Sequence, residues 1–151
     1  MSTLDPEAIA QKLSRMVERI ERLKAFEQLT LEEYLQDDFK QAAIERLLEI
    51  VIDSALSINK TLLKRVAGLV PTDPPQSFQN FESFILVGEN GFIPPQLAEQ
   101  LAPSGSFRNI LAHEYDEIDS EQVYSAFQKA LSQYPLYVKA IQLYLDMLEE
   151  N

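Results

Sequence analysis

The chain has 151 residues, of which 46% are hydrophobic and 25% charged, a length and composition that predict one globular domain. It contains no cysteine, which excludes disulfides and thiolate chemistry. The first residues lack a signal-peptide pattern and no apolar run is long enough to cross a membrane, so we expect a cytoplasmic protein without membrane contact. The formal net charge of −11 would repel a phosphate backbone, so any contact with nucleic acid must be local.

Residues 5–28 are predicted to form the first helix. Asp5 can cap its start, and Pro6 suits the first helical position. Apolar residues recur at helical spacing and form one face; they are Ile9, Leu13, Met16, Ile20 and Leu23.

A basic stripe runs beside this apolar face and consists of Lys12, Arg15, Arg19 and Arg22. It is either a solvated flank, paired with the interleaved Glu18 and Glu21, or an edge that follows phosphates. The interleaved glutamates favour the solvated flank.

The middle of the chain predicts a short helix and a long one. Thr30 begins a capping-box pattern, TLEE, for a helix over residues 31–36. A long helix follows over residues 38–67, and Gly68 ends it. Its wide apolar surface indicates a helix that is central in a bundle, or one covered on its second side by another chain. The main stripe is Ile44, Leu48, Val51, Ala55, Ile58 and Leu62, and the adjacent one is Leu47, Ile50 and Leu63.

Prolines in the second half of the chain predict several loops and helix boundaries. We expect a loop over residues 69–77, a helix over 78–88, a turn over 89–91, and a short helix that begins at Pro94 and Pro95 and ends near Ala102. A break over 103–106 should precede a helix over 107–115 and a link over 116–120.

A last helix is predicted over residues 120–149, kinked or interrupted at Pro135. Its expected core residues are Val123, Phe127, Leu131, Leu136, Val138, Ile141, Leu145 and Leu148. Together these elements predict an all-α, antiparallel helical bundle of five to six helices.

The only histidine lies in the segment Arg108–Tyr115, which reads RNILAHEY. On a helix, Arg108 and Tyr115 share one face, while Asn109 and His113 share the neighbouring face, where Asn109 could orient the imidazole. Arg108 and His113 are about 140° apart around the axis. They converge only through the length of the arginine, or because a second chain brings its own copy of the segment alongside.

These side chains suit cleavage of RNA without a metal. That reaction needs a base for the ribose 2′-OH, a cation for the charge that develops on the phosphate, and an acid for the 5′-oxygen. Histidine serves as acid or base near neutral pH, and arginine binds phosphate oxygens bidentately. Because one histidine cannot be base and acid in one step, a ribonuclease of this sequence requires a homodimer with a composite site.

The pattern Arg108, four residues, His113, one residue, Tyr115, placed just before the last long helix, resembles the HepT family of the HEPN superfamily. The resemblance implies a homodimeric, single HEPN-like domain over residues 1–151. It also implies the ribonuclease toxin of a HEPN/MNT toxin–antitoxin system, acting on RNA without a metal or other cofactor. Arg108 and His113 would be catalytic, with Asn109 in support.

The same resemblance implies a protein partner, a minimal nucleotidyltransferase antitoxin that attaches AMP to Tyr115. Because Tyr115 shares a helical face with Arg108, a bulky anionic nucleotide there would occupy the phosphate-binding arginine and block RNA.

Other interpretations stay open. A non-catalytic HEPN module that binds nucleotide, or regulates a nucleotidyltransferase, fits the net charge of −11. A structural adaptor would bury Arg108 and His113 against each other, far from any second copy. A metal enzyme could use the carboxylates of residues 32–38, EEYLQDD, but no histidine accompanies them at helical spacing. We therefore expect this segment to be a surface that is solvated, flanks the dimer contact or faces the antitoxin.

Overall fold

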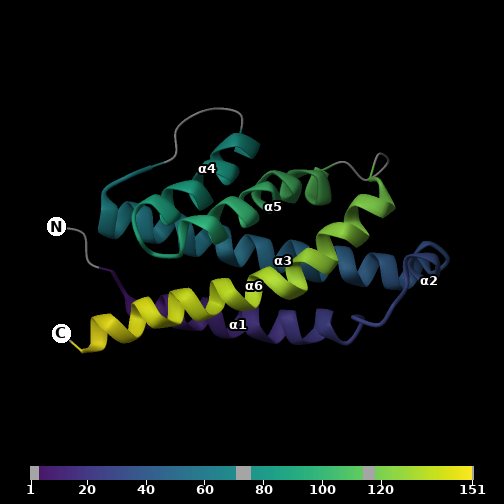
Figure 1. Ribbon diagram of the computed structural model, residues 1–151, viewed down its shortest axis with the longest axis horizontal. Coiled ribbons are helices and arrows are strands. Elements are labelled where there is room, and N and C mark those ends of the chain that lie inside the picture. Colours follow the sequence, from purple (N-terminus) through teal and green to yellow (C-terminus); the bar gives the residue numbers. More distant parts are fainter. Residues whose placement is uncertain (1–3, 71–75, 114–117, 151) are drawn as a thin grey trace.

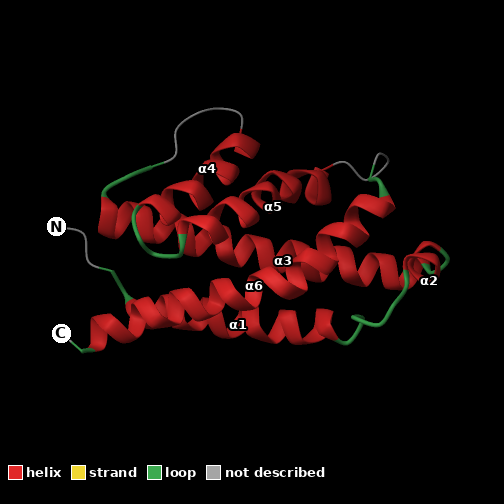
Figure 2. Cartoon of the chain, viewed as in Figure 1, coloured by secondary structure: helices red, strands yellow, loops and turns green. Residues whose placement is uncertain are grey.

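The computed structural model describes residues 4–70, 76–113 and 118–150, with the backbone alone for residues 76–78 and His113. The described residues form six α-helices and one π-helical turn, with no strand among them (Figure 2). The predicted all-α fold is therefore confirmed. No helix in the described ranges is both long and apolar enough to span a membrane. The elements are α1 (Pro6–Lys24), α2 (Leu31–Leu35), α3 (Asp38–Leu62), the π-turn η1 (Leu63–Ala67), α4 (Gln76–Glu89), α5 (Pro95–His113) and α6 (Ser120–Glu149).

The central element is α3, which contacts α1, α4, α5 and α6. Figure 1 shows α1 and α6 along one side of α3, and the pair formed by α4 and α5 along the other. α1 runs antiparallel to α3, and α5 antiparallel to α6, so α1 begins and α6 ends at the same end of the bundle. These neighbours fit the first of the two explanations offered for the wide apolar surface of α3, a helix that is central in the bundle.

Side chains cap the starts of four helices. Asp5 caps α1, and Thr30 and Glu33 form the predicted capping box of α2. Asp37 caps α3 and Asp119 caps α6. Two carboxylates of the acidic segment 32–38 therefore hold helix starts, where a side-chain oxygen satisfies free backbone N–H groups.

The core lies along α3. All five apolar positions predicted on α1 and all six of the main stripe of α3 are buried. The second stripe of α3 is covered less completely, since Leu63 is buried while Leu47 and Ile50 are only half-buried. At the end of α3 the chain turns through η1 and stops at Gly68, which adopts the left-handed conformation with φ of 70°, a typical role for glycine.

The break predicted at residues 103–106 is wrong, because α5 runs without interruption from Pro95 to His113 with Pro103 inside it. The small residues Ser104 and Gly105 allow α5 to pack closely against its neighbouring helices. A Cβ at Gly105 would lie 2.7 Å from the backbone oxygen of Asn80 on α4. Ser104 donates to the oxygen of Leu101 at 2.6 Å and lies 2.7 Å from the hydroxyl of Tyr134 on α6. Arg108 and Asn109 therefore lie near the end of a long helix that packs against α3, α4 and α6.

Of the kink or interruption predicted at Pro135, the interruption is wrong, because Pro135 lies inside α6, one continuous helix of 30 residues. The buried face continues in phase through Ala130, Tyr134 and Tyr137, and Leu136 is 53% exposed. Leu136 was predicted to be a core residue, and it could be one only if the helix restarted in a new phase after the proline. α4 likewise begins at Gln76, inside the predicted loop.

Candidate active site

Arg108 lies near the end of α5 and reaches across to Asp53 in the middle of α3. Its Nε is 2.6 Å from Oδ1 of Asp53, and its Nη2 is 3.4 Å from Oδ2. The hydrogen bond to Asp53 raises the pKa of Arg108, more than burial lowers it. A guanidinium held along one edge stays charged and keeps a defined direction, so Arg108 is a fixed cation.

The Arg108 side chain is 24% exposed. Its remaining nitrogen, Nη1, makes no hydrogen bond to any residue within the described ranges. One edge of the guanidinium can therefore still receive a phosphate oxygen. This exposure argues against the adaptor interpretation, which requires a buried Arg108.

Lys60 is seven residues after Asp53 and so lies on the same face of α3. Its Nζ donates to Oδ1 of Asn80 on α4 at 2.8 Å. Burial lowers the pKa of Lys60, the positive charge of Arg108 lowers it further, and Asp53 opposes both. Lys60 and Arg108 are thus two cations that interact with each other and with the carboxylate of Asp53.

Asn109 directly follows Arg108 and has a buried Oδ1 without a hydrogen-bond partner among the described residues. A buried carbonyl oxygen without a donor is costly. His113, four residues later, is the last residue of the same continuous helix, so its backbone is on the face that Asn109 occupies. Tyr115 lies outside the described residues.

The basic stripe of α1 divides into two parts. Arg19 and Arg22 both bind Glu18, at 2.8 and 2.9 Å, on the exposed side of the helix, which agrees with the solvated flank. Lys12 and Arg15 instead line a pocket between α1 and α3, and Asp53 lines the same pocket. The first two residues of the stripe therefore adjoin the Arg108 site.

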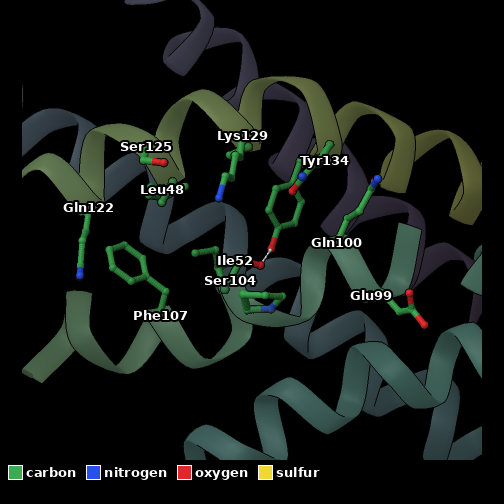
Figure 3. Close-up of a pocket in the computed structure, with 14 residues that line it drawn as sticks. Leu48, Ile52, Glu99, Gln100, Ser104, Phe107, Gln122, Ser125, Lys129 and Tyr134 are labelled. Atoms are coloured by element: carbon green, nitrogen blue, oxygen red, sulfur yellow. Dashed lines mark hydrogen bonds between the residues drawn. The ribbon is translucent and has the colours of Figure 1, made fainter. Parts of the chain in front are cut away.

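A larger cavity of about 480 Å³ lies between α5 and α6 over α3. Figure 3 shows Tyr134 of α6 pointing to Ser104 of α5, with the hydrogen bond between them, and Phe107 beside it. Ile52 of α3 lines this cavity. Asp53, the next residue, points about 100° away from Ile52 around the axis of α3. The cavity is thus on a different side of α3 from the Arg108–Asp53 pair.

The sequence predicted Arg108 and Asn109 as site residues, and it did not point to Asp53 and Lys60, which interact with Arg108 in the structure. The available signal for Asp53 was a single carboxylate in the apolar stretch IVIDSALS. Asp53 is on the face of α3 opposite its main stripe and its side chain is 41% exposed, so no local pattern indicates that a cation from another helix binds it.

A family model and a close relative identify one family for this chain. A family model described as "Ribonuclease HepT-like" matches residues 16–141. The chain is 40% identical over 151 residues to the tRNA nuclease HepT of Aphanizomenon flos-aquae (strain 2012/KM1/D3), covering 100% of this chain and 99% of that protein. It is 34% identical over 99 residues to a putative RNase of Archaeoglobus fulgidus, covering 66% and 67% of the two. A solved structure of YutE, a cytosolic protein of unknown function from Bacillus subtilis, matches with a TM-score of 0.78 at 16% identity, covering 97% of this chain and 94% of that one. This last likeness shows the fold alone.

Proposed function

Because the chain belongs to the HepT-like ribonuclease family, we propose that it is the toxin of a HEPN/MNT toxin–antitoxin system and cleaves RNA without a metal. The observation that carries this proposal is the Arg108 guanidinium, fixed by Asp53 at 2.6 Å and partly exposed in a chain of net charge −11. A fixed cation in an acidic protein is suited to bind one phosphate. The name of the relative from Aphanizomenon flos-aquae, a tRNA nuclease, favours tRNA as the substrate.

The reaction uses the chain's own side chains. One His113 accepts the proton of a ribose 2′-OH, and the 2′-oxygen attacks the adjacent phosphorus. Arg108 stabilises the negative charge on the non-bridging oxygens. As the bond from phosphorus to the 5′-oxygen breaks, a second histidine gives its proton to that oxygen. The products are a 2′,3′-cyclic phosphate and a 5′-hydroxyl.

A homodimer supplies the second histidine, because each chain has one. Two copies related by a two-fold axis place two arginines and two histidines in one cleft. Asn109 supports this site. Its buried Oδ1 lies one helical turn before His113, and in the active dimer it would accept the N–H of the imidazole and so orient the ring.

Tyr115, two residues beyond the end of α5, is the proposed site of modification. A minimal nucleotidyltransferase antitoxin would transfer AMP from ATP to its hydroxyl and release pyrophosphate. The added phosphate would compete with RNA for Arg108. Tyr115→Phe keeps the ring and removes the acceptor, so the variant should still cleave RNA while resisting neutralisation. Transfer of AMP to that variant with full loss of cleavage would contradict the role of Tyr115.

The alternative is a HEPN module that binds nucleotide without cleaving RNA, and the net charge of −11 favours it. The two are separated by incubating the purified protein with tRNA in the presence of EDTA. The proposal expects cleavage that His113→Ala abolishes and that leaves a cyclic phosphate end. Stable binding of nucleotide with intact tRNA would establish the alternative.

A further inference from the structure

The pocket between α1 and α3 has the composition of a phosphate-binding site. It has a volume of about 290 Å³ and is lined by residues of both helices. That equals roughly ten water molecules at about 30 Å³ each, which is room for a phosphate group. Its polar lining consists of Lys12, Arg15, Arg46, Asp53, Ser54 and Ser57.

Two of its cations have no acidic partner among the described residues. Lys12 donates to the hydroxyl of Ser57 at 2.6 Å, an uncharged partner, and Arg15 forms no ion pair there. Arg46, in contrast, pairs with Glu49 at 3.2 Å. Since the carboxylate of Asp53 is engaged by Arg108, the pocket keeps the charge of Lys12 and Arg15 in a strongly acidic protein.

Asp53 joins this pocket to the Arg108 site. Its carboxylate lines the pocket and also binds the guanidinium of Arg108. A strand with one phosphate at Arg108 would therefore have neighbouring phosphates close to Lys12 and Arg15. Asp53 itself repels that strand, and the two free cations offset the repulsion.

We propose that Lys12 and Arg15 form a phosphate subsite that holds the RNA backbone beside the phosphate bound by Arg108. The proposal rests on the ribonuclease function and extends its site along α1. Lysine, arginine and serine are among the side chains that contact phosphates in nucleic-acid complexes. The subsite explains how a chain of net charge −11 can bind RNA, since its contacts are confined to one groove.

The helix provides its own matched control. Lys12→Gln/Arg15→Gln and Arg19→Gln/Arg22→Gln each remove two positive charges from α1, but only the first pair lines the pocket. Both are made in full-length protein that also carries His113→Ala. Binding of a fluorescent single-stranded RNA is then measured across a series of KCl concentrations.

The first pair should weaken binding about tenfold or more and reduce the slope of log K against log salt by about 0.7 for each phosphate that is no longer neutralised. The control pair should change the dissociation constant less than about twofold. Equal effects of the two pairs, or none from the first, would overturn the proposal. The proposal would also be overturned if the first pair left RNA binding unchanged but abolished binding of a nucleotidyltransferase partner, because this surface would then be a protein-binding site.

Loss of the Lys12–Ser57 bond could unfold the double variant, so Arg15→Gln alone is tested beside it. Arg15 makes no such bond, and its replacement should weaken binding at least about threefold and lower the salt slope. Failure of the subsite is distinct from failure of the function. If the natural protein cleaves RNA and the Lys12→Gln/Arg15→Gln variant cleaves it equally well, the subsite alone is rejected. Absence of any cleavage rejects the ribonuclease.

Discussion

The carboxylate of Asp53 holds the guanidinium of Arg108 at 2.6 Å, although the two residues are 55 positions apart in the chain. The pair connects α3 to the end of α5 and sets the direction of the arginine. It also places a negative charge where RNA must approach. Asp53 is therefore expected to favour the rate of cleavage and to oppose the binding of substrate.

Asp53→Asn separates these two effects. The amide binds a guanidinium more weakly than a carboxylate does, so Arg108 should lose its fixed position and cleavage should fall roughly 10- to 100-fold in kcat. With one negative charge fewer, RNA should bind a few-fold more tightly at low salt when His113→Ala prevents cleavage.

Steady-state kinetics and RNA binding together test this prediction, with Asp53→Glu as the conservative variant that should restore part of kcat. A purely structural Asp53 would lower stability without tightening RNA binding. Loss of kcat together with weaker binding would contradict the positioning role.

Much of the fold could be predicted because the signals were local. Asp5 at the start of α1, the capping box of Thr30 and Glu33, and the apolar stripe of α3 depend on residues within a few turns of one another. A helix over the start of RNILAHEY was expected, and α5 covers this segment as far as His113.

The errors concern residues whose role depends on distant partners. The sequence predicts a break around Gly105, but this residue is small because the backbone of Asn80 passes next to it. Tyr134 and Tyr137 continue the buried face of α6 because their hydroxyls form hydrogen bonds. The hydroxyl of Tyr134 bonds with Ser104, and that of Tyr137 donates to Asn59 and to the backbone oxygen of Ala55. Asp53 was missed for the same reason, since only the folded bundle brings Arg108 to it.

Gly105→Ala tests the packing that supports the motif helix. The new Cβ would lie 2.7 and 2.8 Å from the backbone oxygen and carbon of Asn80, and neither atom belongs to a flexible side chain. Overpacking of this kind costs about 1–3 kcal/mol of unfolding free energy. Urea denaturation measures the loss.

The comparison variant is Glu99→Ala on the exposed side of α5, which should shift stability by less than about 0.5 kcal/mol. A Gly105→Ala protein as stable as Glu99→Ala would mean that α4 and α5 can separate without cost.

Glu45 on α3 gives a stability effect that depends on pH. Burial raises its pKa above 4.5, and its charge contributes, after burial, to a raised pKa of Tyr34. A carboxyl with a raised pKa in the folded state binds more protons there than in the unfolded chain. Its contribution is therefore favourable below pH 4.5 and is lost as pH rises through the raised pKa.

Glu45→Gln should consequently be more stable than the natural protein at neutral pH, and this advantage should shrink as pH falls towards 4.5. Exposed Glu32→Gln removes the same charge and corrects for the general repulsion in a chain of net charge −11. Thermal melts at several pH values compare the two. An advantage for Glu45→Gln that persists unchanged at about pH 4 would show that burial of its charge is not the cause.

His113 allows the composite site to be tested by mixing chains. A dimer of one natural chain and one His113→Ala chain, purified through two different tags, keeps both copies of Arg108 but has a single histidine. If base and acid come from different chains, this dimer lacks one of them and should lose at least about a hundredfold in kcat, the contribution of one general acid or base. A mixed dimer with Arg19→Gln in place of His113→Ala should keep full activity. If the His113→Ala dimer instead keeps about half of the natural rate, each chain works alone, and the 2′-OH mechanism would need an acid other than the second histidine.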